Sequence, residues 1–214
     1  MKVLLIADEE CKALWDYYQP GRLDGIDLII SCGDLKAEYL SFLVSVWHAP
    51  LLYVHGNHDG RYSRKPPEGC MCIEDELVRV GPLRILGLGG SIRYNLGPHQ
   101  YTEQEMARRI HKLRRPIKRN GGVDIVVSHA PVHGFGDAET GPHRGFDAFA
   151  EMAGQYHPQY WFYGHVHNHY GDAPRVLCSE GTTFINAFER YILELPGEYS
   201  EPEYLIRRRR SSDD

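Results

Sequence analysis

The feature that most constrains the fold of this chain is a series of short, continuous apolar runs, each ending in polar residues or in a turn with glycine. Three of these runs lie near the N-terminus, at residues 3–7, 26–31 and 51–54. Runs of this length that are rich in β-branched residues are typical of strands buried on both faces. Residues 35–46, between two of the runs, have helical apolar spacing. This alternation predicts a layered α/β domain.

The rest of the chain predicts further strands and two helices. One helix, over residues 102–119, opens with the capping box Thr102-x-x-Glu105. The region 61–69 contains two prolines and a glycine and is expected to be a loop. The other predicted elements are strands at 78–88 (around Gly81-Pro82), 124–128 and 160–163, a helix at 146–156, and consecutive strands over 175–195. A β-rich end therefore follows an alternating start.

Composition excludes several classes of protein. The chain has 214 residues, of which 42% are hydrophobic and 25% charged, enough to bury a full core. Its 24 Lys+Arg and 29 Asp+Glu give a formal charge of -5, which argues against a surface for nucleic acid or anionic membrane. The first apolar run is too short for a signal peptide or a membrane span, so a cytoplasmic protein is expected. The five cysteines are expected to be reduced, with a redox role for Cys70-x-Cys72 left open.

We expect one domain over residues 1–197, followed by a polar tail over residues 198–214. The tail carries four adjacent arginines at 207–210, which can grip a phosphate backbone or an acidic partner. A solvated terminus is the simpler interpretation, so no nucleic-acid partner is expected.

Metal-type ligands follow five of the predicted strands. In open α/β sheets the carboxyl ends of the strands border the ligand-binding crevice, so these side chains are expected to converge. Of 12 histidines, seven fall between residues 129 and 169, which also indicates a metal site. Any one of these residues alone is equally well explained as a cap or a satisfied core group. The candidates are Asp8, Glu10, Asp34, Asn57, His129, His165 and His167.

The ordered motifs around these residues resemble a known family. Asp8-x-Glu10, Gly33-Asp34, Gly56-Asn57-His58-Asp59, Ser128-His129 and Gly164-His165-Val166-His167 are similar to the five motifs of the calcineurin-like metallophosphoesterases, over about residues 3–190. Gly136-Asp137 and His143-x-Gly145 add a resemblance to the small, single-domain phosphodiesterase-like branch. The resemblance implies an α/β fold, a four-layer sandwich of two mixed β-sheets flanked by helices.

The resemblance also implies a centre of two divalent metal ions. Asp8, Glu10, Asp34 and His167 would hold the first ion, and Asp34, Asn57, His129 and His165 the second. A hydroxide bridging the two ions would be the nucleophile in an in-line displacement. His58 is then the candidate general acid, and Asp59 the partner that fixes its tautomer.

Position 10 departs from the family pattern, which places a histidine where this chain has Glu10. A third carboxylate makes the first set of ligands harder and richer in oxygen, so we expect Mn²⁺, with Fe or Zn as alternatives. Further candidates for substrate contacts are Arg93, Tyr94, His133 and His143. Surface roles are equally well supported for the two histidines and are the simpler interpretation for Arg93 and Tyr94.

The sequence thus predicts a metal-dependent phosphoesterase that acts on a small phosphate ester, with phosphodiesters preferred. Two alternatives stay open. A phosphomonoesterase would use the same dinuclear core. A scaffold protein could keep the fold and lose catalysis, although only one ligand, Glu10, departs from the pattern.

Overall fold

A computed structural model describes residues 1–139, 141–167 and 174–206. Within these residues the first large sheet has five strands in the order β13-β1-β2-β3-β4. Strands β1 to β4 are parallel, and β13 pairs antiparallel with β1. The strands are β1 (Lys2–Ile6), β2 (Leu28–Ser31), β3 (Leu51–Tyr53), β4 (Met71–Cys72) and β13 (Tyr191–Glu194).

The second large sheet has seven strands in the order β11-β12-β10-β9-β6-β5-β14. Its four central strands are parallel, and β11, β5 and β14 pair antiparallel with their neighbours. The strands are β5 (Leu77–Val80), β6 (Leu83–Leu88), β9 (Ile125–Ser128), β10 (Tyr160–Tyr163), β11 (Val176–Ser179), β12 (Thr182–Asn186) and β14 (Glu203–Ile206). A small parallel pair, β7 (Ser91–Ile92) and β8 (Gln100–Tyr101), lies apart from it.

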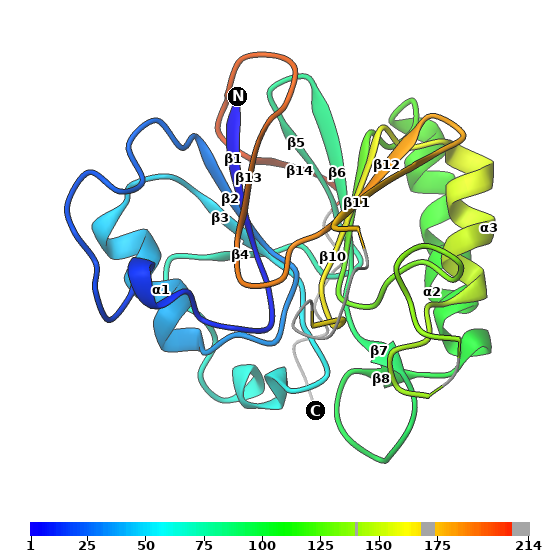
Figure 1. The fold of residues 1–214 in the computed structure, drawn as a ribbon. Helices are drawn as coiled ribbons and strands as arrows, with labels where there is room; N and C mark the ends of the chain where they lie inside the picture. The colour runs from blue at the N-terminus through cyan, green and yellow to red at the C-terminus, as the bar shows by residue number, and fades with distance from the viewer. Residues whose placement is uncertain (140, 168–173, 207–214) are drawn as a thin grey trace.

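Three hydrophobic clusters divide the molecule into four layers. One cluster joins the facing sides of the two sheets, with Leu5 and Ile30 from the first and Ile85 and Phe162 from the second. A second cluster packs α1 (Ala37–Val46) on the first sheet. The third packs α2 (Glu103–Arg119) and α3 (Asp147–Tyr156) on the second sheet. Figure 1 shows the resulting order of helix, sheet, sheet and helices, which confirms the predicted four-layer sandwich.

Helix α2 forms for the reason that its sequence suggested. The side chain of Thr102 accepts a hydrogen bond from the backbone of Glu105, and Glu105 bonds back to the Thr102 backbone, so the predicted capping box is confirmed. Its apolar residues Met106, Ile110, Leu113 and Ile117 recur every three or four positions and are buried.

Some segments differ from the prediction. Residues 203–206, placed in a solvated tail, form β14 at the edge of the second sheet, because Tyr204 and its neighbours pair with β5 and pack on the core between the sheets. The region 61–69 is not all loop, since it begins within the short helix η2 (Asp59–Ser63). A further short helix, η1 (Lys12–Leu14), was not predicted. Residues 207–210 lie outside the described residues.

The five cysteines are free thiols, in agreement with the expected reduced state. Among the described residues no helix has the length and apolar character that a membrane span requires.

Candidate metal centre

Four strands bring acidic and histidine side chains to one edge of the molecule. Asp8 and Asp34 follow β1 and β2 of the first sheet, and His129 and His165 follow β9 and β10 of the second. Ligand atoms of Asp34, His129 and His165 all lie within 4.8 Å of one another. The structure therefore brings three of the predicted ligands together where the two sheets meet.

Three of these residues hold a backbone conformation that favours glycine. Asp8, Asp34 and His165 have φ of 66°, 58° and 67°, in the left-handed region. Asp and His tolerate this region better than most residues, yet each such position costs roughly 1–3 kcal/mol. Strain of this kind persists where surrounding contacts over-determine it, and it gathers at ligand-binding sites.

Glycines let these strained loops approach one another. A Cβ at Gly56 would overlap the carboxylate of Asp34, and one at Gly164 would lie 2.8 Å from Asp8 Oδ2. Both contacts are below 3.0 Å, which is shorter than the contacts that real Cβ atoms make. The glycines of the two motifs therefore make room for the carboxylates.

His129 faces two oxygen atoms with a single ring nitrogen. The ring is fully buried, and its Nδ1–H donates to the carbonyl of Cys32 at 2.8 Å. Nε2 lies 3.2 Å from Asp34 Oδ2 and 3.0 Å from Asn57 Oδ1. With Nδ1 protonated, a neutral imidazole offers only a lone pair at Nε2. Three lone-pair atoms then converge, and only a proton on Nε2 or a cation between them satisfies all three.

The ionisation of the cluster agrees with this geometry. Burial lowers the pKa of His129, but the charge of Asp34 outweighs it and raises the pKa to about 9. Burial raises the pKa of Asp34, yet His129 reverses the shift and leaves the pKa at about 2. Burial raises the pKa of Asp8 to about 7 and lowers the pKa of His165 to about 3. His165 is therefore neutral at pH 7, as a metal ligand must be.

Asp59 contacts the backbone of two ligand loops. Its Oδ2 accepts hydrogen bonds from the backbone N–H groups of Asp34 at 2.9 Å and Gly56 at 2.7 Å. Asp59 therefore ties two ligand loops together, its described hydrogen bonds do not reach the His58 ring, and its role toward His58 stays a prediction. Asp59 is buried beneath the loops, whereas the His58 side chain is 74% exposed.

His58 lies at the mouth of the cluster. Its backbone N–H donates to Asp34 Oδ1 at 2.7 Å, and its Nε2 is 4.0 Å from Asp34 Oδ2. The backbone contact fixes the residue, while the exposed ring is free to meet a substrate.

Among the described residues, Glu10 and His167 are not members of the group formed by Asp34, His129 and His165. The carboxylate of Glu10 accepts a hydrogen bond from the backbone N–H of Lys36 at 3.1 Å and pairs with its Nζ at 3.4 Å. His167 is exposed, and its ring lies against Phe188 at 5.1 Å between centroids. Asp8 is closer to the cluster, since its two carboxylate oxygens accept from the backbone N–H of His165.

The comparison with family models decides the assignment. A model described as calcineurin-like phosphoesterase matches residues 1–169, most of the chain. The chain belongs to the calcineurin-like phosphoesterase family. The family acts through divalent metal ions on phosphoesters, so the chain is a metal-dependent phosphoester hydrolase, and the cluster at Asp34 is its candidate metal centre.

Solved structures agree on the fold of this calcineurin-like phosphoesterase. One structure aligns with a TM-score of 0.66 at 12% identity, over 96% of this chain and 99% of the other. TT1561 of Thermus thermophilus aligns with a TM-score of 0.62 at 16% identity, over 88% of this chain and 89% of its own. At these identities the likeness extends to the fold alone. No curated protein matches the chain.

The predicted substrate contacts of the phosphoesterase divide into two groups. Tyr94 and His143 lie beside the cluster: the Tyr94 hydroxyl accepts a hydrogen bond from Asn57 Nδ2 at 3.0 Å, and the His143 ring is 5.0 Å from that of His165. Arg93 and His133 are held by acidic neighbours, Glu105 at 2.8 Å and Asp137 at 2.8 Å respectively.

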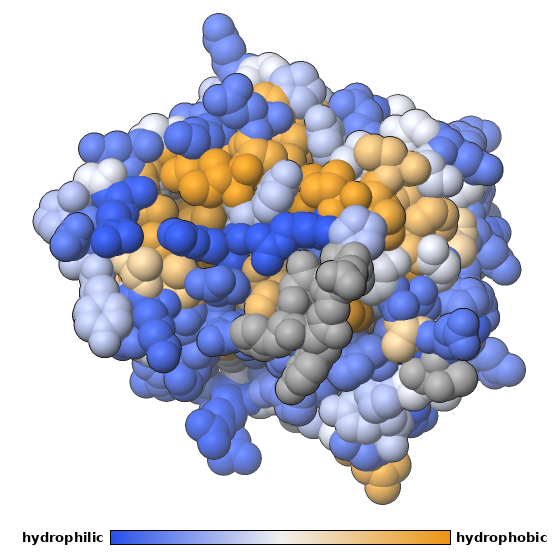
Figure 2. All heavy atoms as spheres, in the orientation of Figure 1, coloured by the Kyte–Doolittle hydropathy of each residue, from blue (hydrophilic) through white to orange (hydrophobic). Residues whose placement is uncertain are grey.

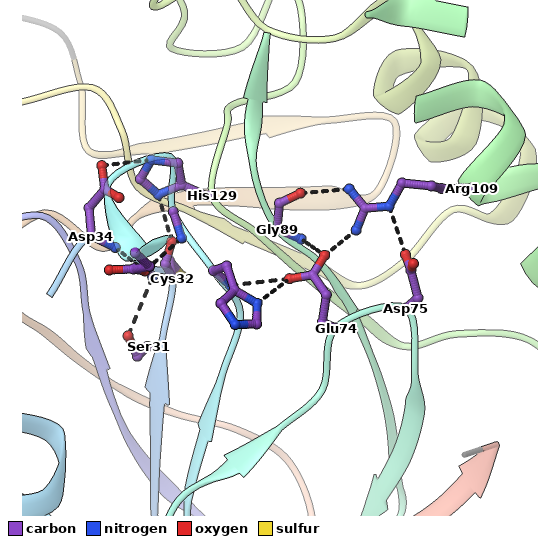
Figure 3. A network of polar contacts seen from close by, with 12 residues as sticks. Ser31, Cys32, Asp34, Glu74, Asp75, Gly89, Arg109 and His129 are labelled. Atoms are coloured by element: carbon purple, nitrogen blue, oxygen red, sulfur yellow. Dashed lines mark hydrogen bonds and ion pairs between the residues drawn. The ribbon is translucent and has the colours of Figure 1, made fainter. Parts of the chain in front are cut away.

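A partly buried ion network of the phosphoesterase was not predicted from the sequence. Arg109 of α2 pairs with Glu74, binds Asp75 Oδ1 through Nε at 2.9 Å, and donates to the carbonyl of Gly89 at 2.8 Å. Figure 3 shows this network in the same view as the Asp34–His129 pair. Glu74 Oε2 in turn accepts from the backbone N–H and the Nδ1 of His55, two residues before Asn57. The signal in the sequence was an arginine on the apolar face of α2, between Met106 and Ile110.

Proposed function

We propose that this phosphoesterase is a phosphodiesterase with two divalent metal ions, most suitably Mn²⁺, and a small phosphodiester as its substrate. The observation that carries the proposal is the convergence of His129 Nε2, Asp34 Oδ2 and Asn57 Oδ1. These are nitrogen and oxygen donors of the kind that bind first-row divalent ions, and they face one point that only a proton on Nε2 or a cation can satisfy.

The donor set divides between two ions as the sequence motifs suggest. Asp34, Asn57, His129 and His165 would hold one ion, and Asp8, Glu10, Asp34 and His167 the other. When bound, the two ions supply Lewis-acid stabilisation of the phosphoryl oxygens and an activated water as nucleophile. The chain itself fixes these donors through strained backbone at Asp8, Asp34 and His165.

His58 completes the proposed chemistry. We assign its exposed ring the delivery of a proton to the leaving oxygen, and the backbone bond from His58 to Asp34 supports this role because it keeps the residue at the mouth of the cluster. Asp59 acts indirectly, because its hydrogen bonds hold the loops that carry Asp34 and Asn57 in position relative to each other.

A preference for diesters follows from charge. A phosphomonoester dianion brings one more negative charge than a diester to a site already built from several carboxylates. The resemblance of the motifs around His129 and His143 to the phosphodiesterase-like branch supports the same preference.

The test combines metal analysis with a matched pair of substrates. The protein is loaded with Mn²⁺, and metal content is measured by mass spectrometry together with kcat/KM for bis(p-nitrophenyl) phosphate and p-nitrophenyl phosphate. We expect two ions per chain and the higher kcat/KM for the diester. Asp34→Asn should lose most metal and activity, whereas the exposed Asp24→Asn should behave as wild type.

Other results would assign the protein differently. Two ions with a higher kcat/KM for the monoester would identify a phosphomonoesterase. Little metal and no turnover of either compound would identify a scaffold. Full metal content in Asp34→Asn would reject the metal centre described here.

A further inference from the structure

A hollow of about 550 Å³ opens beside the candidate metal centre. Asn57 and His58 line the side nearest the cluster, and Arg61, Arg64 and Lys65 line the side formed by η2 and the residues after it. Asn57 is a proposed ligand and His58 the proposed acid. A substrate whose phosphodiester lies at the metal centre therefore extends directly into this hollow.

The basic residues of the hollow are held in place by a buried anchor. Tyr62, in the middle of η2, is buried, and its hydroxyl donates to the carbonyl of Leu35. Its neighbours Arg61 and Arg64 are consequently turned outward, and both are exposed. Figure 2 shows that the surface over this part of the view, below α1, is hydrophilic.

Among the described residues, only one of the three basic side chains of the hollow forms an ion pair with a carboxylate. Lys65 Nζ lies 2.8 Å from Glu38 Oε1 and is paired. Within the part of the chain that the structure describes, neither Arg61 nor Arg64 forms an ion pair. Lys65 does most to lower the pKa of the Glu38 carboxyl, and Arg61 lies near enough for its charge to help, but Arg61 forms no ion pair with that carboxyl. Arginine matches the geometry of phosphate with paired N–H donors, so an anion of that kind fits Arg61 and Arg64 best.

We propose that this hollow binds a second phosphate group of the substrate, so that the preferred substrates are phosphodiesters that carry a further phosphate on one side of the scissile bond. The inference rests on the proposed phosphodiesterase function and adds the substrate class. The second phosphate binds to Arg61 and Arg64 and is not hydrolysed. Its binding lowers KM without changing the chemistry at the metal centre.

The adjoining hollow on the other side of His58 does not suit an anion. Arg61 and Lys65 border this hollow too, but Glu10, Asp34 and Glu38 line it with them, and it holds about 380 Å³. Repulsion from these carboxylates favours the larger hollow, where Arg61 lies with Arg64 and no carboxylate of the described residues lines the wall. The charge pattern around His58 therefore gives the substrate an orientation.

The test uses two chromogenic diesters with the same scissile group. They are thymidine 5'-(p-nitrophenyl phosphate) and the same compound with a 3'-phosphate. For the wild-type protein loaded with Mn²⁺, we expect the 3'-phosphate to lower KM about tenfold with little change in kcat, the effect of one or two exposed charge-assisted hydrogen bonds. The ratio of the two KM values should fall to about one in Arg61→Ala/Arg64→Ala and persist in Arg79→Ala, an exposed arginine on β5.

A binding measurement separates this inference from the proposed function. Isothermal titration calorimetry with thymidine 3',5'-bisphosphate measures binding to the hollow whether or not either diester is hydrolysed. We expect binding that weakens at high salt and is about tenfold weaker in Arg61→Gln/Arg64→Gln, which keeps the length of the side chains. Equal affinity in wild type and variant, or no binding to wild type, would overturn the inference. Absence of turnover with binding intact would overturn the phosphodiesterase function instead.

Discussion

The hydroxyl of Tyr94 accepts a hydrogen bond from the side-chain amide of Asn57, whose carbonyl oxygen lies 3.0 Å from His129 Nε2. The two contacts fix the orientation of the amide, with its nitrogen turned outward and its oxygen turned into the cluster. Tyr94 is itself held by its backbone N–H, which donates to Gln100 Oε1 at 3.1 Å. A residue predicted to contact substrate therefore also orients a proposed ligand.

Tyr94→Phe should weaken metal binding about tenfold, because the Asn57 amide then loses the partner that orients its oxygen. Metal titration by calorimetry would measure the change, and Tyr17→Phe, at a tyrosine that is 70% exposed, provides the control. If the affinity of Tyr94→Phe equals that of wild type, Tyr94 does not position Asn57.

His58→Ala should keep the metal ions and lower kcat by about 10² to 10⁴, the usual effect of removing a positioned acid. The loss should shrink as the leaving group becomes more acidic, because good leaving groups need less protonation. A series of aryl phosphodiesters would measure this dependence, with His111→Ala on the exposed face of α2 as control. An equal loss for every leaving group would reject the role of acid.

Metal binding should strengthen as the pH rises from 7 to 9. A cation at Nε2 of His129 displaces a proton that is held with a pKa of about 9. For one displaced proton the apparent affinity rises about tenfold per pH unit below that pKa. Calorimetry in buffers of different ionisation enthalpy would count the proton, and binding without proton release at pH 7 would contradict the prediction.

Loss of the same proton should make the metal-free protein less stable at high pH. The pKa of His129 is raised above its ordinary 6.5 in the folded chain, so its contribution to stability is complete below pH 6.5 and is lost as the pH rises through 9. Thermal unfolding with a chelator should show a Tm that falls between pH 6.5 and 9. A Tm that rises over this range would contradict the assignment.

Arg109→Ala should lower the free energy of unfolding by about 3–5 kcal/mol, because it leaves Glu74 and Asp75 buried without their counter-charge. Urea unfolding would measure the loss. Arg108→Ala, at the exposed neighbouring position of α2, should change stability by no more than about 0.5 kcal/mol. A loss in Arg109→Ala as small as this would show that the network adds little to stability.

Glu10→His should strengthen the proposed metal site to which Glu10 contributes. In wild type, the carboxylate of Glu10 is engaged by Lys36 and must leave it to bind an ion. An imidazole does not compete for the Lys36 ammonium and suits Zn²⁺ better than a carboxylate does. Competition between Zn²⁺ and Mn²⁺ should therefore shift toward Zn²⁺ in the variant. Identical metal preference in Glu10→His, Glu10→Ala and wild type would show that Glu10 is not a ligand.

The sequence allowed much of this fold to be predicted, because its signals are local. The continuous apolar runs around Leu5 and Ile30, and the capping box at Thr102, depend on neighbouring residues alone. Strand β14 could not be predicted in this way. Its pairing with β5 depends on a free sheet edge formed by residues more than a hundred positions away.

The same difference between local signals and long-range contacts applies to the candidate site. Asp34, His129 and His165 follow strands whose ends meet, so the convergence of these side chains could be predicted from the order of the elements. The hydrogen-bond partners of Asp59 could not be predicted, because they depend on how the loops of Asp34 and Gly56 fold over its carboxylate. The Lys36 contact of Glu10 likewise depends on the path of the loop before α1.

The four-layer arrangement has a consequence for how the molecule opens. Asp34 belongs to one sheet, and His129 and His165 belong to the other, while each sheet has its own hydrophobic cluster with its own helices. An ion held between them adds a second link to the core that the two sheets share, because partial opening of either side releases it. Metal supply would then set the cooperativity of unfolding as well as catalysis, and amide exchange in β2 and β10 would slow together when the ion binds.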